Sequence, residues 1–239
     1  MKTLTVKKEK RNMLLDQETI SRVTDVKQFS SEKILKHLDK VSAWIGGGNP
    51  SPVTVEIDMT NICNHKCPEC VVSYYQRKDN SSLSKEFAAS IVDQISKAGA
   101  RGLIFTGGGD PLCNPHTPDI AVRAKEKGLD VGFITNGQLL NEESSRKILE
   151  SCVWVRISLD AATPEVFLRT HGQNEHSFRK VVENIGRLTD MKRTLNSRCT
   201  IGVGYLTSAE TKGDLDKAAV LCKNLGVDYI QFRPMQIHH

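Results

Sequence analysis

The chain has 239 residues, of which 38% are hydrophobic, 26% charged and 5% aromatic, which is an ordinary globular composition without an apolar run long enough to span a membrane. The N-terminus lacks the apolar core and cleavage site of a signal peptide, so a cytoplasmic location without a membrane partner is expected. Most of the formal net charge of +5 lies in residues 1–11, with little surplus elsewhere. This distribution favours a flexible basic tail over 1–29 and argues against a nucleic-acid partner.

The first predicted element is a helix over 30–45, where apolar residues recur at helical spacing. Three glycines and Asn49-Pro50 end it, so 30–52 is interpreted as an N-terminal helix with a Gly-rich linker. From residue 53 the chain alternates strands and helices without a shift in composition, which predicts one domain over 53–239. The predicted strands are 53–60, 102–106, 131–135, 153–160, 198–206 and 229–235.

Cap residues delimit the helices between these strands. Thr117-Pro118 and Thr163-Pro164 fit an N-cap followed by the first helical position, and Asn141 fits an N-cap before two glutamates. The segment 163–188 is expected to be one helical region. Six strands that alternate with helices predict an α/β fold with a parallel sheet and outer helices.

The alternation within the strands distinguishes between two kinds of parallel sheet. In 153–160 aliphatic residues alternate with Arg156, Ser158 and Asp160, and 53–60 alternates similarly. Helices on both faces would bury such polar groups, at a cost of roughly a few kcal/mol for each unpaired one. A curved sheet around a ligand-filled lumen avoids this cost, which predicts an open partial (β/α)6 barrel. Asp160 is interpreted as a partner of Arg156 inside it.

Three of the seven cysteines lie within eight residues, directly after the first predicted strand. Cys63, Cys67 and Cys70 have C-x3-C-x2-C spacing, and thiolates are the ligands of iron–sulfur clusters. A four-iron cluster held by three thiolates leaves one iron free to bind a further ligand. The alternative is a zinc ion with Cys3His ligation, in which His65 or His116 is the fourth ligand. The cysteines alone leave both interpretations open.

The cysteine loop and the residues that follow the next strands resemble the radical S-adenosylmethionine (SAM) superfamily, over about 50–237. The C-x3-C-x2-C loop after the first strand is the family signature, and the Gly-Gly-Gly-Asp run after the second is similar to its GGE-type motif. The ends of the third and fourth strands are also similar, and an arginine follows the fourth. The residues that the resemblance assigns to SAM are Gly107, Gly108, Gly109, Asp110, Asn136, Ser158 and Arg169. Arg233, at the end of the last strand, is expected to contact cofactor or substrate.

The resemblance implies a [4Fe-4S] cluster on Cys63, Cys67 and Cys70, whose fourth iron binds the amino and carboxylate groups of SAM. An electron from an external donor then cleaves SAM to a 5′-deoxyadenosyl radical, which abstracts hydrogen from a substrate. The motifs are similar to members that modify peptides or sugar-derived metabolites and that often carry a C-terminal SPASM or twitch domain. No cysteine follows Cys222, so no auxiliary cluster is expected from this C-terminus. Because the sequence stops at the end of the sixth predicted strand, a missing C-terminal region or a partner chain is expected to close the barrel.

Two positions depart from the family pattern. Glu69 precedes the third cysteine where an aromatic residue is usual, and Tyr74 or Tyr75 is expected to replace its packing near the adenine. Asp110 replaces a glutamate and is one methylene shorter. The rival hypothesis is a zinc-stabilised nucleic-acid-binding module, which requires aromatic residues interleaved with basic ones. The low aromatic content and the terminal position of the basic charge disfavour it.

Overall fold

The computed structural model describes residues 31–73 and 79–235, and the chain divides into two compact units, Met1–Ser51 and Pro52–His239. In the first unit, Ser31–His37 forms a 3-10 helix (η1) that continues into an α-helix, α2 (Leu38–Ile45). Gly46 and Gly48 donate hydrogen bonds to carbonyls of its last turn, which ends the helix where the glycine run predicted. The predicted tail over 1–29 lies outside the described residues, as do Tyr74 and Tyr75.

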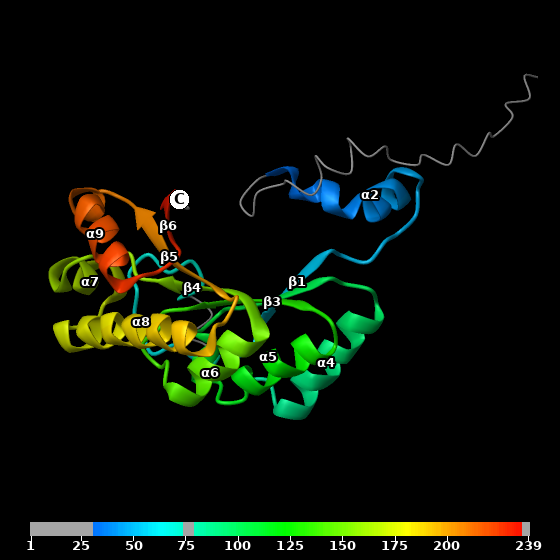
Figure 1. Cartoon of the computed structure of the whole chain (residues 1–239), viewed down its shortest axis with the longest axis horizontal. Helices are drawn as coiled ribbons and strands as arrows, with labels where there is room; N and C mark the ends of the chain where they lie inside the picture. Colours follow the sequence, from blue (N-terminus) through cyan, green and yellow to red (C-terminus); the bar gives the residue numbers. More distant parts are fainter. Residues whose placement is uncertain (1–30, 74–78, 236–239) are drawn as a thin grey trace, which may run out of the picture. The chain divides into compact units, whose positions relative to one another are not determined.

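The second unit is built on a sheet of six parallel strands, each paired with its neighbours in sequence order (Figure 1). Among the described residues the first and last strands do not pair, so the sheet is open, and the predicted partial (β/α)6 barrel is confirmed. The observed strands differ from the predicted ones by at most two residues at either end. They are β1 (Thr54–Asp58), β2 (Gly102–Thr106), β3 (Asp130–Thr135), β4 (Cys152–Ser158), β5 (Thr200–Thr207) and β6 (Tyr229–Pro234).

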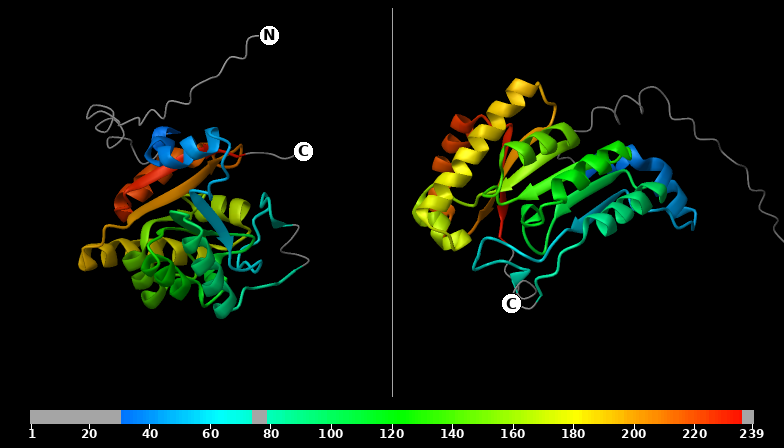
Figure 2. Two further views of the ribbon diagram at one scale, coloured as in Figure 1. Left: turned by 90° about the vertical axis from the view of Figure 1, so that its right-hand side faces the viewer. Right: turned by 90° about the horizontal axis from the view of Figure 1, so that it is seen from below.

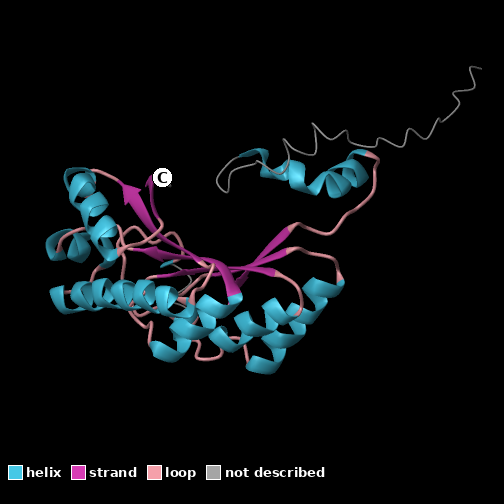
Figure 3. Cartoon of the chain, viewed as in Figure 1, coloured by secondary structure: helices cyan, strands magenta, loops and turns pink. Residues whose placement is uncertain are grey.

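Helices cover the outer face of the sheet, and Figures 1 and 3 show α4, α5, α6 and α8 along the same side of it. Figure 2 shows the successive helices spread out in the order of the strands that they connect. No helix in 31–73 or 79–235 combines the length and hydrophobicity that crossing a bilayer requires. The helices are α4 (Lys85–Lys97), α5 (Thr117–Glu126), α6 (Glu142–Ser151), α7 (Pro164–His171), α8 (Glu175–Leu195) and α9 (Leu215–Leu225), with 3-10 turns η2 (Pro111–Cys113) and η3 (Lys212–Asp214).

The core lies between this helical layer and the outward side chains of the strands. Phe105 of β2 and Phe133 of β3 are fully buried, with ring centroids 5.8 Å apart. Val155 and Ile157 of β4 are fully buried as well, as the apolar half of the predicted alternation requires. Burial of each such side chain stabilises the folded state by roughly 1.5–3 kcal/mol, so this layer keeps the sheet, and the strand ends that form the site, in place.

Two predictions about the helices are wrong. The N-cap of α5 is His116, and Thr117, which was predicted as the cap, is the first residue of the helix. The segment expected as a single helical region is divided into α7 and α8 at Gly172, whose φ of +61° is left-handed and ends the first helix. Asn174 then caps α8 by accepting a 3.0 Å hydrogen bond from the N–H of Ser177. Residues 169–177 contain no apolar residue, and Gly172 and Asn174 are typical of a helix end and a new N-cap, so the sequence did carry this signal.

The inner face of the sheet alternates large and small residues. A Cβ atom on Gly132 would lie 2.3 Å from the ring of Trp154, and one on Gly202 would lie 2.0 Å from the ring of Tyr229. Glycine therefore makes room for these rings on neighbouring strands. Arg156 donates a 3.2 Å hydrogen bond to Gln231 Oε1, and the predicted pairing of Arg156 with Asp160 is not observed.

Candidate functional site

The three clustered cysteines lie in the loop between β1 and α4. Main-chain hydrogen bonds fix this loop on both sides: Asn61 N–H donates to Ser81 O at 2.9 Å, and Lys66 N–H donates to His171 O at 3.2 Å. The thiols of Cys63, Cys67 and Cys70 are all half-buried and line one cavity of about 320 Å³. Residues that follow β2, β3 and β4 also line it, so it lies at the carboxyl ends of the strands, where α/β sheets bind ligands.

The donor set fits a thiolate-bound metal group. Burial raises the pKa of Cys67 to about 12, and the neighbouring Cys63 and Cys70 contribute to this rise because their charges disfavour a further thiolate. Burial also raises the pKa of Cys63. Neighbouring thiols in one loop ionise together when a cationic metal group compensates their charge. Their common cavity leaves room beside them, as a cluster with one free iron requires.

The zinc alternative fits less well. His116 is exposed at the N-cap of α5 and does not line the cavity. His65 is buried, and its Nδ1 faces Nδ1 of His171 at 3.1 Å. The structure groups His65 and His171 with Cys67 alone, because these three ligand atoms lie within 4.8 Å of one another. The Cys3His arrangement of the zinc alternative is therefore not assembled among the described residues.

The glycine run after β2 lies directly against the cysteine loop. A Cβ atom on Gly109 would lie 2.0 Å from the carbonyl oxygen of Ile62, a distance that no side chain tolerates. Gly109 N–H donates to Thr60 O at 2.8 Å, and Asp110 N–H donates to Ile62 O at 3.0 Å. The glycine run thus lets the backbone pack closely against the cysteine loop. Gly107 and Gly109 also line the cavity.

Asp110 is buried between the ends of β2 and β3. Its carboxylate accepts hydrogen bonds from the hydroxyl of Thr135, the N–H of Asn136 and the N–H of Leu112. Burial raises the pKa of Asp110, and these donors oppose the rise because they stabilise the charged form. Although Asp110 is one methylene shorter than the glutamate usual in the family, its carboxylate reaches these donors. It therefore joins the glycine motif to the end of β3.

Asn136 and Ser158 lie at the carboxyl ends of β3 and β4, and both line the cavity. The Asn136 amide donates to Asn64 Oδ1 at 2.8 Å, and its nitrogen lies 4.0 Å from Cys63 Sγ. Asn136 thus connects the end of β3 to the cysteine loop. Ser158 contributes a half-buried hydroxyl to the same cavity.

The structure brings most of the predicted site residues together, but not all. Gly107, Gly109, Asp110, Asn136, Ser158 and the three cysteines share the cavity, whereas Gly108, Arg169 and Arg233 do not line it. Arg169 forms an ion pair with Glu210, whose carboxylate lies 2.9 Å from its Nε, and both side chains are about half exposed. A Cβ atom on Gly108 would meet the side chain of Asn61, and Arg233 is exposed.

Sequence reasoning missed His171 at this site, considered His65 only as a zinc ligand and misassigned Asp160. His65 and His171 line the cavity together with Asp160, which was interpreted as a partner of Arg156. Asp160 instead accepts a hydrogen bond from the N–H of Leu206, and its φ of +47° is left-handed. Burial raises its pKa to about 6. A non-glycine residue in this conformation beside a cavity is a recognised signal of function, but φ cannot be read from sequence.

Comparisons with known proteins agree with this geometry. A family model described as the Radical SAM superfamily matches residues 57–221. The Fe-coproporphyrin III synthase of Methanosarcina barkeri is 34% identical over 134 residues, which are 54% of this chain and 31% of that protein. The mycofactocin maturase MftC of Mycobacterium ulcerans is 27% identical over 183 residues, or 75% of this chain and 46% of that protein.

Among solved structures, Streptococcus suis SuiB bound to S-adenosylmethionine has a similar fold, with a TM-score of 0.67 at 15% identity. The match covers 92% of this chain and 50% of SuiB, so the chain spans between about a third and a half of these relatives. The family model covers well over half of the chain and includes the C-x3-C-x2-C loop after β1. This chain therefore belongs to the radical SAM superfamily.

Proposed function

We propose that the second unit of this chain is the SAM-cleaving barrel of a radical SAM enzyme. Cys63, Cys67 and Cys70 hold a [4Fe-4S] cluster in this proposal, and SAM occupies the cavity beside it. The observation that carries the proposal is the composition of that cavity, in which three thiols from one loop meet residues from the ends of β2, β3 and β4. When bound, the cluster supplies the electron that cleaves SAM to a 5′-deoxyadenosyl radical, which abstracts hydrogen from the substrate.

The chain's own residues bind and orient SAM. Gly107 and Gly109 allow the backbone to approach its methionine moiety, and Asn136 and Ser158 offer an amide and a hydroxyl in the same cavity. Apolar lining by Ile134, Leu206 and Met235 keeps water from the reacting groups. Asp110 is proposed to position the site and not to contact SAM, because its carboxylate holds the end of β3 against the glycine run.

Arg169 is proposed to bind the SAM carboxylate, and Arg233 is proposed to contact substrate. Arg169 is assigned to the SAM carboxylate by resemblance, and it must leave Glu210 to reach that carboxylate. A guanidinium binds a carboxylate through two parallel hydrogen bonds, which favours the exchange. Arg233 lies in β6, on the strand that carries the far edge of the open sheet, and is proposed to contact substrate there.

The substrate is proposed to be a peptide or a sugar-derived metabolite. A peptide is suggested by the structure of SuiB bound to the precursor peptide SuiA, and a sugar by the dTDP-4-amino-4,6-dideoxy-D-glucose ammonia-lyase of Streptomyces venezuelae, which is 28% identical over 161 residues. An external one-electron donor is a further proposed partner. A further C-terminal region or a partner chain is proposed to close the open side of the barrel.

The test is cofactor assembly followed by SAM cleavage. The chain is reconstituted with iron and sulfide without oxygen, reduced with dithionite and given SAM, and 5′-deoxyadenosine is measured. The wild type is expected to form it, and Cys67→Ala is expected to lose both the iron and the product. Cys113→Ala is the matched control, because Cys113 is a half-buried thiol that lies near Asn64 but does not line the cavity.

Two results contradict the proposal. One is a wild-type chain that binds a single zinc ion and takes up no iron. The other is a loss of iron in Cys113→Ala that equals the loss in Cys67→Ala, because the ligand set would then be wrong. The substrate class is tested with deuterated peptide and sugar pools, since the true substrate transfers deuterium into 5′-deoxyadenosine.

A further inference from the structure

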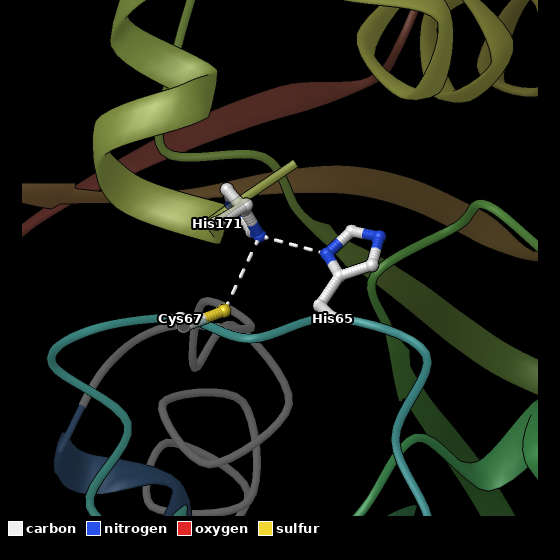
Figure 4. A group of neighbouring side chains, drawn as sticks. All are labelled: His65, Cys67 and His171. Carbon is white, nitrogen blue, oxygen red and sulfur yellow. Dashed lines mark hydrogen bonds between the residues drawn. The ribbon is translucent and has the colours of Figure 1, made fainter. Parts of the chain in front are cut away.

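Two buried histidines lie directly behind one of the three clustered cysteines. His65 comes from the cysteine loop, and His171 is the last residue of α7, more than a hundred residues later. Nδ1 of His171 lies 3.1 Å from Nδ1 of His65 and 3.6 Å from Sγ of Cys67, as Figure 4 shows. One ring nitrogen therefore faces both another imidazole and the sulfur of a predicted cluster ligand.

The hydrogen-bond partners determine which nitrogen carries the proton. Nε2 of His65 lies 2.7 Å from Oε1 of Gln138, and an amide oxygen can only accept. His65 Nε2 is therefore the donor. A neutral imidazole that donates from Nε2 presents its Nδ1 as an acceptor. The contact between the two Nδ1 atoms then assigns the hydrogen to Nδ1 of His171, which leaves its buried Nε2 unprotonated and without a hydrogen-bond partner.

The N–H of His171 has two acceptors within reach, Nδ1 of His65 and Sγ of Cys67. A neutral thiol is a weak acceptor, and the free chain favours the imidazole. A metal-bound thiolate carries negative charge and is the stronger acceptor of the two. The distance of 3.6 Å already suits an N–H···S contact, so no large movement is required.

The position of the His171 ring is fixed from several sides. It stacks on Phe167, with centroids 4.5 Å apart and planes 22° from parallel. Its outer nitrogen, Nε2, lies 3.6 Å from Oδ2 of Asp160. Asp160 is itself held in a left-handed conformation by its bond to Leu206. These contacts point Nδ1 toward Cys67.

The end of α7 is also attached to the cysteine loop. His171 O accepts a hydrogen bond from Lys66 N–H, next to Cys67 in sequence. A Cβ atom on Gly172 would lie 2.4 Å from Lys66 O, so glycine is needed for this approach. The distance between the His171 ring and Cys67 is thus set by the backbone as well as by side chains.

We propose that, in the chain loaded with its cluster, His171 is a positioning residue that donates an N–H···S hydrogen bond to Cys67 and thereby raises the reduction potential of the cluster. The proposal rests on the proposed function, since it needs the cluster on Cys63, Cys67 and Cys70. The added electron increases the negative charge on the sulfurs, and a donor directed at one of them stabilises the reduced state. The stacking on Phe167 and the main-chain bond to Lys66 hold the ring for this contact.

The test is the midpoint potential of the reconstituted cluster, measured by redox titration with electron paramagnetic resonance detection. His171→Phe keeps an aromatic ring against Phe167 but has no donor, whereas His171→Asn restores an N–H close to the position of Nδ1. His176→Phe is the matched control, because His176 is exposed on α8. We expect a more negative potential for His171→Phe, a return toward the wild-type value for His171→Asn, and no change for His176→Phe.

A His171→Phe chain with full iron content and the wild-type potential overturns the proposal, and so does an equal shift in the Phe and Asn variants. If the variants do not fold, the wild type carrying ¹⁵N-labelled histidine decides by electron–nuclear double resonance. A weak histidine nitrogen coupling to the reduced cluster supports the hydrogen bond. No coupling, or the strong coupling of an iron-bound nitrogen, contradicts it. A wild-type chain that takes up no iron instead contradicts the proposed function.

Discussion

The main-chain N–H of Asn136 donates a 2.7 Å hydrogen bond to the buried carboxylate of Asp110. This bond joins the glycine motif after β2 to the end of β3, and Asn136 in turn bonds to Asn64 in the cysteine loop. Three loops that are distant in sequence are thereby held at one cavity. The geometry of the site depends on these polar links, and several of them can be removed singly.

Replacing Asp110 with asparagine tests the first link. The amide of asparagine has one acceptor oxygen and presents its own N–H groups to the three donors that the carboxylate satisfies. Asp110→Asn is expected to lower the free energy of unfolding by about 1–3 kcal/mol, as measured by urea denaturation. Asp130→Asn, at an exposed position of β3, is the control and is expected to change it by less than about 0.5 kcal/mol. Equal stability of the two variants contradicts this role of Asp110.

The contact between the glycine run and the cysteine loop is tested at Gly109. An added Cβ would meet the main-chain oxygen of Ile62, which cannot move aside as a side chain can. Gly109→Ala is expected to destabilise the chain by about 1–3 kcal/mol and to reduce the iron retained after reconstitution. Gly213→Ala is the matched control, because nothing lies within 4 Å of the Cβ position there. The close approach is not needed if both variants retain iron and stability equally.

The proposed bond between Arg169 and the SAM carboxylate is tested by comparing SAM affinity in Arg169→Ala and in Glu210→Ala, the variant of its ion-pair partner. Loss of a charge-assisted hydrogen bond to the SAM carboxylate costs about 1.5–3 kcal/mol, so Arg169→Ala is expected to weaken SAM binding roughly ten- to a hundredfold. Glu210→Ala is expected to leave binding unweakened, since it only frees the guanidinium. Neither variant should change stability by more than about 1 kcal/mol, because the ion pair is half exposed. Calorimetric titration of the reconstituted protein measures both affinities. If Arg169→Ala binds SAM as tightly as the wild type, Arg169 does not bind the SAM carboxylate, and its partner is Glu210 alone.

The fold could be predicted because local patterns and the architecture agree. Alternation in β4 separated Val155 and Ile157, which are buried in the core, from Arg156 and Ser158 on the inner face. Asn141 was predicted as a cap, and it forms a capping box with Ser144. The break at Gly172 was missed although residues 169–177 contain no apolar residue, because the apolar patterns before and after that gap were interpreted as one helix. Gly172, in a left-handed conformation, ends α7.

The site was predictable where it is local in sequence and unpredictable where the sheet assembles it. Cys63, Cys67 and Cys70 are neighbours in one loop, so their spacing carries the information. His65 and His171 come together only because the end of α7 packs on that loop, a relation that no spacing records. The pairing of Arg169 with Glu210 also depends on tertiary contacts, and the motif around Arg169 gives no sign of it.

The central claim is that three thiolates hold a four-iron cluster whose fourth iron is free for SAM. Mössbauer spectroscopy of the chain reconstituted with ⁵⁷Fe, recorded without and with SAM, tests it most directly. We predict four irons per chain, of which one changes its isomer shift when SAM is added while three do not. A chain that holds a lone tetrahedral metal ion, or a cluster in which no iron responds to SAM, would contradict the claim.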